Sequence, residues 1–153
     1  MDSQVTELLG RNRLIDELLR AKLEVASPLR DRGIDLIAYA DLASEVPVFV
    51  ARPIQMKAAT SAVFALDQKY EKFPNLLIAY VWHLGEPGAA VTYVLSYAEA
   101  LGVAESMQYT KTESWRRGSY VTTRPSDRLQ RLLAPFGMTP DKWWQRVTQR
   151  PEG

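Results

Sequence analysis

Hydrophobic residues recur at helical spacing near the start of the chain. The apolar residues on this stripe are Val5, Leu8, Leu9, Ile15, Leu18 and Leu19. Repetition every three or four residues predicts an amphipathic helix over residues 4–23. Asp2 or Ser3 can cap its start, whereas Gly10 weakens it because glycine is a poor helix former. The polar Asn12 falls on the same stripe, so we expect it to face inward or toward a cleft.

The middle of the chain alternates short extended segments with turn signals. The segments that predict strands are residues 23–27, 34–40, 47–59, 76–83 and 90–96. The segment LLIAYVWH at 76–83 is apolar throughout, which is typical of a central strand buried on both faces. Pro53 predicts an edge, a bend or a bulge in its strand, because proline lacks a backbone N–H. GEPG at residues 85–88 predicts a turn, and a short helix is expected around Asp67–Lys72.

Three further helices are expected toward the C-terminus. Ser96 can cap a helix that ends near Gly102, and Ser126 begins another. Thr139 followed by Pro140 begins the last one. The C-terminal helices, residues 126–150, either pack on the domain or serve association. Helix, strands and then helices predict one α/β (α+β) domain over residues 1–153, with a mixed central sheet of four or more strands flanked by helices.

The amino-acid composition excludes several kinds of site but does not by itself identify a function. The 153 residues include no cysteine and one histidine, His83, which excludes disulfides, thiolate zinc sites and multi-histidine metal centres. The net charge is only +1, so global charge does not predict a nucleic-acid partner. The start of the chain lacks the features of a signal peptide, and no apolar run is long enough to span a membrane. We therefore expect a cytoplasmic protein with no membrane association.

Basic and aromatic residues are interleaved between residues 111 and 131. The basic residues there are Lys111, Arg116, Arg117, Arg124, Arg128 and Arg131. Trp115 and Tyr120 lie among them, and such a segment can contact a phosphate backbone and bases. A solvated surface segment explains the same pattern.

An acid interrupts the apolar run RGIDLIAYA at residues 32–40. Burying Asp35 there is costly unless it pairs with a cation or binds one. On the strand that follows, Gln55 and Lys57 point to the same face, and Met56 points to the opposite layer. If the two strands pair, Asp35 lies beside Gln55, and a hard cation such as Mg²⁺ fits these oxygen ligands. The alternative is a buried Asp35–Lys57 ion pair.

Gly33-Ile34-Asp35, followed after a loop by Ile54-Gln55-Met56-Lys57, resembles the motif of the PD-(D/E)XK nuclease superfamily. The resemblance is closest to small prokaryotic members that are restriction-endonuclease-like or Holliday-junction-resolvase-like. It covers roughly residues 4–135, including LLIAYVW and SWRRGSY. It implies a restriction-endonuclease-like fold and a Mg²⁺-dependent (or Mn²⁺-dependent) endonuclease that hydrolyses DNA phosphodiester bonds. Members of this superfamily often act as dimers, and the apolar C-terminus permits a homodimer.

The resemblance also implies roles for individual residues. Asp35 would be the metal-binding acid, Gln55 would occupy the second acidic position, and Lys57 would be the catalytic lysine. The main-chain carbonyl of Met56 would be a further metal ligand. Arg116, Arg117 and Arg124 are candidates for contacts with the DNA backbone.

Two departures from the family pattern keep other functions open. Gln55 supplies no charge, and the acid expected on the first helix is replaced on the inward stripe by Asn12. Glu17 is the nearest acid on the helix, Glu24 lies on the next strand, and Asp31 lies in the turn before the motif. A nuclease-fold module without catalysis, binding nucleic acid or a protein partner, is the first alternative. A role in assembly through the tryptophan-rich C-terminal helices is the second.

Overall fold

A mixed five-stranded sheet forms the centre of the molecule in the computed structural model, which describes residues 1–149. Its strands, in the order in which they pair, are β1 (Glu24–Ala26), β2 (Leu36–Tyr39), β3 (Ala51–Ala58), β5 (Leu77–Trp82) and β6 (Val91–Ser96). Strands β3 and β5 are parallel, and the other neighbours are antiparallel. This confirms the predicted α+β class with a mixed sheet. No helix among residues 1–149 is long and apolar enough to cross a membrane.

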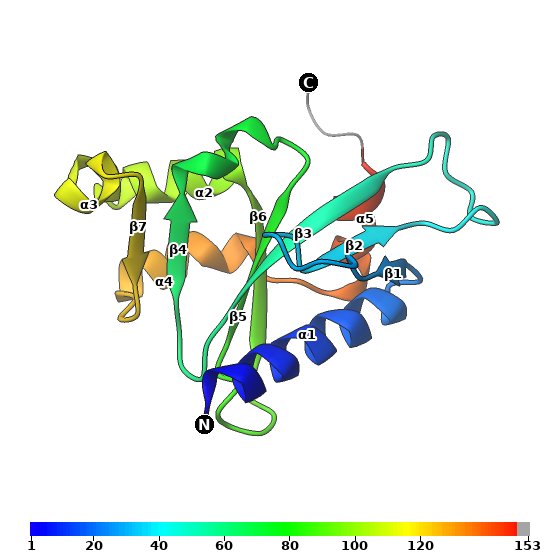
Figure 1. Cartoon of the computed structure of the whole chain (residues 1–153), viewed down its shortest axis with the longest axis horizontal. Helices are drawn as coiled ribbons and strands as arrows, with labels where there is room; N and C mark the ends of the chain where they lie inside the picture. The colour runs from blue at the N-terminus through cyan, green and yellow to red at the C-terminus, as the bar shows by residue number, and fades with distance from the viewer. Residues whose placement is uncertain (150–153) are drawn as a thin grey trace.

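Each face of the sheet is covered by a different layer (Figure 1). Helices α1 (Ser3–Arg20) and α5 (Pro140–Thr148) pack on one face. Helices α2 (Tyr97–Ser106) and α4 (Asp127–Leu133) cover the other face, together with a two-stranded sheet. The remaining elements are β4 (Phe64–Asp67), β7 (Ser119–Thr122), α3 (Glu113–Arg116), η1 (Gln68–Lys72), η2 (Tyr109–Lys111) and η3 (Ala134–Phe136). The β4–β7 sheet and α3 were not expected from the sequence.

Strand β5 is buried along its whole length, as its unbroken apolar sequence predicts. Leu77, Ala79 and Val81 pack toward α1 and α5. Tyr80 and Trp82 point to the other layer, because successive strand side chains alternate between faces. The Tyr80 hydroxyl donates to the Ala65 carbonyl at 2.6 Å, and the Trp82 indole N–H donates to the Val63 carbonyl at 2.7 Å. These two bonds fix β4 and its preceding loop over the sheet.

The predicted helix starts agree with the structure. Ser96 forms a capping box with Glu99, and Ser126 and Thr139 each accept a backbone N–H as N-caps. Helix α2 continues past Gly102 to Ser106. Within the predicted segment 126–150, of which residue 150 lies outside the described residues, Trp143 is fully buried against the α1 side of the sheet. Its indole therefore packs in the core rather than being offered to a partner.

Pro53 lies where β3 has a single neighbour, which confirms the predicted edge position. It pairs with Ile37 of β2, whereas pairing with β5 begins only at Ile54. Beyond Ile54 the situation reverses, because the pairing with β2 ends and that with β5 continues. The second half of β3 therefore has a free edge on the side of β2.

Helix α1 turns a different side to the sheet from the one its strongest apolar stripe predicts. The buried residues of the helix are Thr6, Gly10, Leu14 and Leu18. Val5, Leu8 and Leu19 are exposed, and so is Asn12. The prediction that Asn12 faces inward is therefore wrong. The physical reason is that a helix packed on a sheet needs a close-approach position, and Gly10 supplies it.

Gly10 sets how closely α1 lies on β3. A Cβ atom added there would stand 2.9 Å from the Ala58 Cβ and 3.0 Å from the Met56 Sδ. The Ala58 Cβ cannot rotate away, so overpacking costs about 1–3 kcal/mol, and the better helix propensity of alanine returns about 1 kcal/mol. We expect Gly10→Ala to lower the free energy of unfolding by up to about 2 kcal/mol. Urea unfolding would measure this, and a raised midpoint would contradict the close packing.

Candidate functional site

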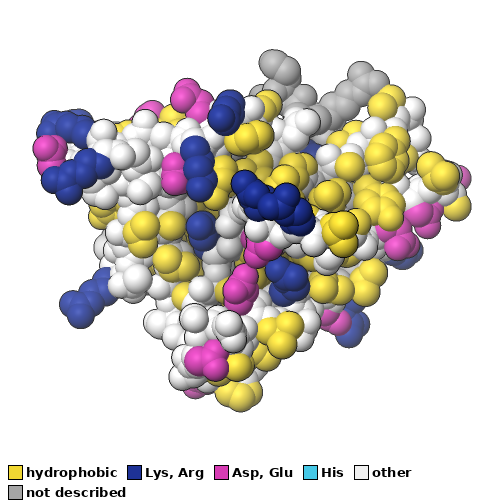
Figure 2. All heavy atoms as spheres, viewed as in Figure 1, with side chains coloured by type: hydrophobic (Ala, Val, Ile, Leu, Met, Phe, Trp, Pro, Cys, Tyr) yellow, Lys and Arg dark blue, Asp and Glu magenta, His cyan; other side chains and the backbone are white. Residues whose placement is uncertain are grey.

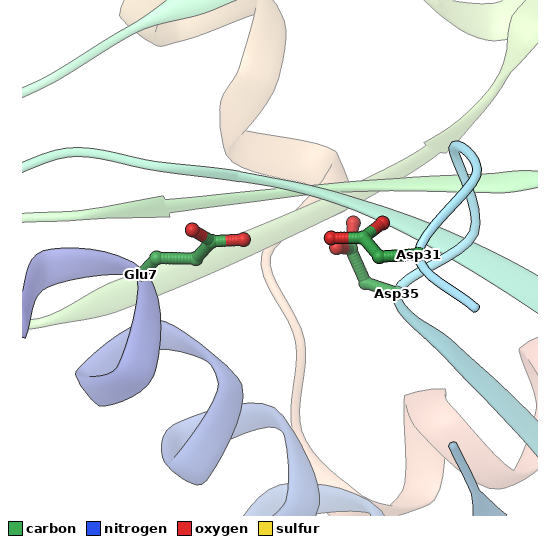
Figure 3. A group of neighbouring side chains, drawn as sticks. All are labelled: Glu7, Asp31 and Asp35. Atoms are coloured by element: carbon green, nitrogen blue, oxygen red, sulfur yellow. The ribbon is translucent and has the colours of Figure 1, made fainter. Parts of the chain in front are cut away.

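Three carboxylates from separate segments meet at the free edge of β3. Glu7 comes from α1, Asp31 from the loop after β1, and Asp35 from the residue just before β2. Each offers an oxygen, and the three oxygens lie within 4.8 Å of one another. Figure 3 shows Glu7 reaching from the helix toward Asp31 and Asp35, which approach from the opposite side. Asp35 is buried, whereas Glu7 and Asp31 are exposed.

Asp35 is held at this edge by both its backbone and its side chain. Its N–H donates to the Ile54 carbonyl at 2.9 Å. Its Oδ2 accepts a hydrogen bond from the N–H of Met56 at 2.7 Å. Met56 lies beyond the end of the pairing between β2 and β3, so this N–H has no partner in β2. Gly33, with a φ of 101°, makes the turn into this position with a conformation that favours glycine. The carboxylate thus replaces a ladder partner and is fixed before any ligand arrives.

The charges around Asp35 act in both directions. Burial raises the pKa of Asp35, the hydrogen bond from Met56 lowers it, and the charge of Asp31 raises it again. Arg11 and Lys57 lower this pKa through their positive charges. Arg11 Nη2 lies 3.7 Å from Asp35 Oδ1. A concentrated negative cluster therefore has two cationic neighbours, one on α1 and one on β3.

Gln55, Met56 and Lys57 alternate across β3 as the sequence predicts. Met56 is buried in the layer toward α1, and Lys57 stands opposite Tyr80, whose side chain belongs to the other layer. The Gln55 Oε1 is buried without a hydrogen-bond partner among the described residues. The Met56 carbonyl points to the same edge as its N–H, and it accepts only a long 3.4 Å bond, from Gln55 Nε2. Two oxygens beside the acid cluster therefore have free coordinating capacity.

An open groove runs past these residues. It has a volume of about 620 Å³ and is lined by the start of α1, the end of β3 with the loop that follows it, and Thr123. Glu7 and Lys57 line the groove, along with the hydroxyl side chains of Ser3 and Thr6. A chain-like substrate lying in this groove would contact Lys57 and one acid of the cluster, Glu7.

Asn12 and Glu17, the two residues of α1 predicted to lie near the site, are both away from the acid cluster in the structure. Asn12 is exposed on the outward side of α1. Glu17 lies at the contact of α1 with β6, where it accepts the Thr92 hydroxyl at 2.8 Å and approaches Arg13 at 3.7 Å. The acid of α1 that the structure brings to the cluster is Glu7. Because Gly10 and Leu14 are buried, Glu7 and Arg11, which are one turn apart, lie on the flank of the helix beside β3. The apolar stripe through Leu8 and Leu19 predicts a different orientation of the helix and therefore does not indicate this position.

Glu17 gives the fold a pH dependence that does not involve the acid cluster. Burial raises the pKa of Glu17, although Thr92 and Arg13 oppose the rise. A raised folded-state pKa means that ionisation destabilises the fold, so stability falls as pH rises through that pKa. We expect Glu17→Gln to match the parent in stability below the ordinary glutamate pKa and to exceed it at neutral pH. Urea midpoints measured from acid to neutral pH test this, and a variant less stable at neutral pH would contradict it.

The basic residues named from the sequence are at the surface. Arg116 ends α3, where it pairs with Glu113 at 3.3 Å, and Arg117 follows it. Arg124 comes directly after Thr123, which lines the groove. Figure 2 shows acidic side chains in the middle of the face with Lys and Arg beside them, and further Lys and Arg side chains at the α3 end. Arg124 is thus the residue of the three that the chain places next to the groove lining.

Tyr70 is a further side chain near the cluster. It is almost fully buried in the middle of η1. Burial raises its pKa, and the charges of Asp67 and Asp35 raise it further. Its neighbour Lys69 pairs with Asp67 at 3.8 Å. Tyr70 therefore belongs to the wall behind Asp35, on the face of the sheet opposite α1.

Comparisons with protein-family models, curated proteins and solved structures found no match to this chain.

Proposed function

We propose that this protein is a cytoplasmic, Mg²⁺-dependent endonuclease that hydrolyses DNA phosphodiester bonds. The observation that carries the proposal is the meeting of Glu7, Asp31 and Asp35 within 4.8 Å at the edge of β3, beside the strand that carries Lys57. Carboxylates next to a lysine at the mouth of a groove suit the hydrolysis of a phosphate ester. The resemblance of Asp35, Gln55 and Lys57 to the PD-(D/E)XK motif supports the same reaction.

The donor set fits a hard divalent cation. Mg²⁺ and Mn²⁺ prefer oxygen ligands, and protein sites often supply one or two carboxylates with carbonyls and waters completing the shell. Asp35, Glu7 and Asp31 would supply carboxylate oxygens. The unpartnered Gln55 Oε1 and the Met56 carbonyl are neutral oxygens on the same strand. The buried and unsatisfied Gln55 Oε1 supports this reading, because such an atom is costly unless something binds it.

The residues of the chain would divide the work of hydrolysis. A bound Mg²⁺ would polarise a phosphoryl oxygen and provide a nucleophile at neutral pH. The Lys57 ammonium would orient the attacking water and offset the negative charge that develops on the phosphate. Arg11 would leave Asp35 when the cation binds and become a donor for a phosphate oxygen. Arg124, next to the groove lining, would contact the DNA backbone, and Arg116 and Arg117 at the end of α3 are further candidates for such contacts.

A cleavage assay tests the proposal. Supercoiled, linear, single-stranded and branched DNA would be incubated with the parent protein in Mg²⁺, Mn²⁺ or EDTA. We expect cutting of at least one substrate with either metal and none in EDTA. Cutting that persists in EDTA, or no cutting of any substrate at any metal concentration, would contradict it.

A nuclease-fold module without catalysis is the second candidate. Two observations favour it: Gln55 is neutral, and Arg11 already lies 3.7 Å from Asp35 as a built-in counter-ion. Such a module would retain DNA in EDTA and lose it as salt rises, because its binding would rest on phosphate contacts. Retention of labelled DNA at increasing salt, without metal, distinguishes it from a protein that does not bind DNA.

A further inference from the structure

The outward side of α1 is apolar, although an exposed helix face is ordinarily polar. Val5 is 44% exposed, Leu8 58% and Leu19 53%. Leu9, at 39% exposure, flanks them. The helix lies along the outside of the molecule (Figure 1), and its own domain uses the opposite side, through Gly10 and Leu14. Val5, Leu8 and Leu9 lie near the start of the helix and Leu19 near its end, and exposed apolar side chains gathered on one side of a helix mark an interaction surface.

The spacing on this side is that of a helix made to pack against another helix. Val5, Leu8, Asn12, Ile15 and Leu19 follow one another at alternating intervals of three and four, which is the a/d pattern of a heptad. Asn12 occupies the middle position of the five. A single asparagine in such a seam sets register and partner number at some cost in stability. We name these five residues the outer seam.

The outer seam is complementary to itself in the antiparallel direction. Val5 and Leu19 are equally far from Asn12 along the helix. Ile15 is partly buried against the core of its own domain, so it offers only part of its side chain to a partner. Exposed charge also has a direction, because Asp2 and Glu7 lie toward the start of α1, whereas Lys22 lies at its end beside Arg20, which pairs with the exposed Asp16 at 2.9 Å. Antiparallel pairing of two copies brings opposite charges together and opposes the helix dipoles, whereas parallel pairing brings like charges together.

We propose that two copies of this chain associate through antiparallel α1 helices, with their Asn12 side chains facing each other on the twofold axis. The two amides can donate to and accept from one another. Val5 of each copy packs against Leu19 of the other. Glu7 and Arg11 lie on the flank of α1 and stay open to the groove. This association does not depend on the proposed function.

The size of the surface predicts a modest affinity. An 18-residue helix is about 27 Å long, and its outer side alone is smaller than the roughly 800 Å² that each partner buries in a standard interface. A second hollow, of about 370 Å³, adjoins the end of α1 and is lined by Lys22, Pro140 and Trp144. Antiparallel pairing brings the partner's helix start toward this hollow, where exposed Met1 adds apolar area.

Disulfide mapping tests the direction of pairing, and the chain is suited to it because it has no cysteine. Val5→Cys and Leu19→Cys would be prepared separately, mixed and oxidised gently. We expect the mixed Val5→Cys/Leu19→Cys disulfide to exceed either symmetric product at least about tenfold, because only Cα atoms within about 4.4–6.8 Å can be bridged. Symmetric products in excess, or equal amounts of all three, would overturn antiparallel pairing.

Light scattering tests the association itself. We expect the parent at about 100 µM to show a mass near twice 17.3 kDa, and the double variant Leu8→Lys/Leu19→Lys to return to the single-chain mass. Leu42→Lys, at a position 94% exposed outside the outer seam, is the matched control and should leave the dimer intact. Melting curves confirm that each variant is folded. A single-chain mass for the parent, or a dimer that survives the double substitution, would refute the proposal.

Discussion

Asp35→Asn is expected to lower the rate of DNA cleavage about 10³-fold or more while leaving the fold intact. A carboxylate that holds a catalytic cation contributes several kcal/mol to the transition state, and about 4 kcal/mol corresponds to about 10³-fold in rate. Asparagine keeps an oxygen that can accept the Met56 N–H, as Asp35 Oδ2 does at 2.7 Å. The substitution therefore removes the charge without opening the edge of β3. Initial cleavage rates at saturating Mg²⁺, with melting temperatures alongside, measure the effect.

Asp41→Asn is the matched control for this prediction. Asp41 is an exposed acid that accepts the Ala43 N–H at 2.8 Å in the loop after β2, and its loss should change the rate less than twofold or so. An Asp35→Asn protein that is folded and cuts at the parental rate would remove Asp35 from the proposed chemistry. Equal losses in both variants would point to a general effect of charge.

Lys57→Met is expected to reduce the cleavage rate by about 10²–10⁴-fold, the usual contribution of a positioned proton-transfer or charge-stabilising group. Methionine retains the apolar stem of the lysine and removes the ammonium. Loss of the Lys57 ammonium also removes a positive charge that repels a cation bound at Asp35. We therefore expect Mn²⁺ affinity to be kept or slightly increased while turnover is lost.

Lys69→Met is the control, since Lys69 is exposed, pairs with Asp67 and lies outside the groove lining. Its rate should stay close to that of the parent. Parental turnover in folded Lys57→Met would show that the lysine has no part in catalysis. A joint loss of Mn²⁺ binding and turnover would instead make Lys57 a structural partner of Asp35.

The features that could be predicted from the sequence are those determined by residues close to one another along the chain. The unbroken apolar run of β5 predicts a strand buried on both faces, and Ser96, Ser126 and Thr139 predict helix starts because their side chains bond to the next backbone N–H groups. The alternation of Met56 and Lys57 follows from strand geometry alone. These elements are fixed by interactions within a few residues.

The features that were missed depend on contacts between distant segments. Helix α1 has two candidate inner sides, and the more apolar one, through Leu8 and Leu19, is not the one that packs on the sheet. The packed side instead combines the close approach of Gly10 to Ala58 with the fully buried Leu14 and Leu18. Glu7 was overlooked for that reason, since its place beside Asp35 follows from the rotation of the helix. Strands β4 and β7 are short and far apart in sequence, so no local pattern indicates that they pair.

Calorimetric titration with Mn²⁺ is the most direct test of the claim that Glu7, Asp31 and Asp35 form one cation site. The account predicts one site for the parent, competition by Mg²⁺, and loss of binding of at least about tenfold in Glu7→Gln and in Asp35→Asn. Glu17→Gln, which changes the other conspicuous acid of α1, should bind as the parent does. A parent that binds no Mn²⁺ at millimolar concentration, or binding that Glu7→Gln and Asp35→Asn leave unchanged, would contradict it.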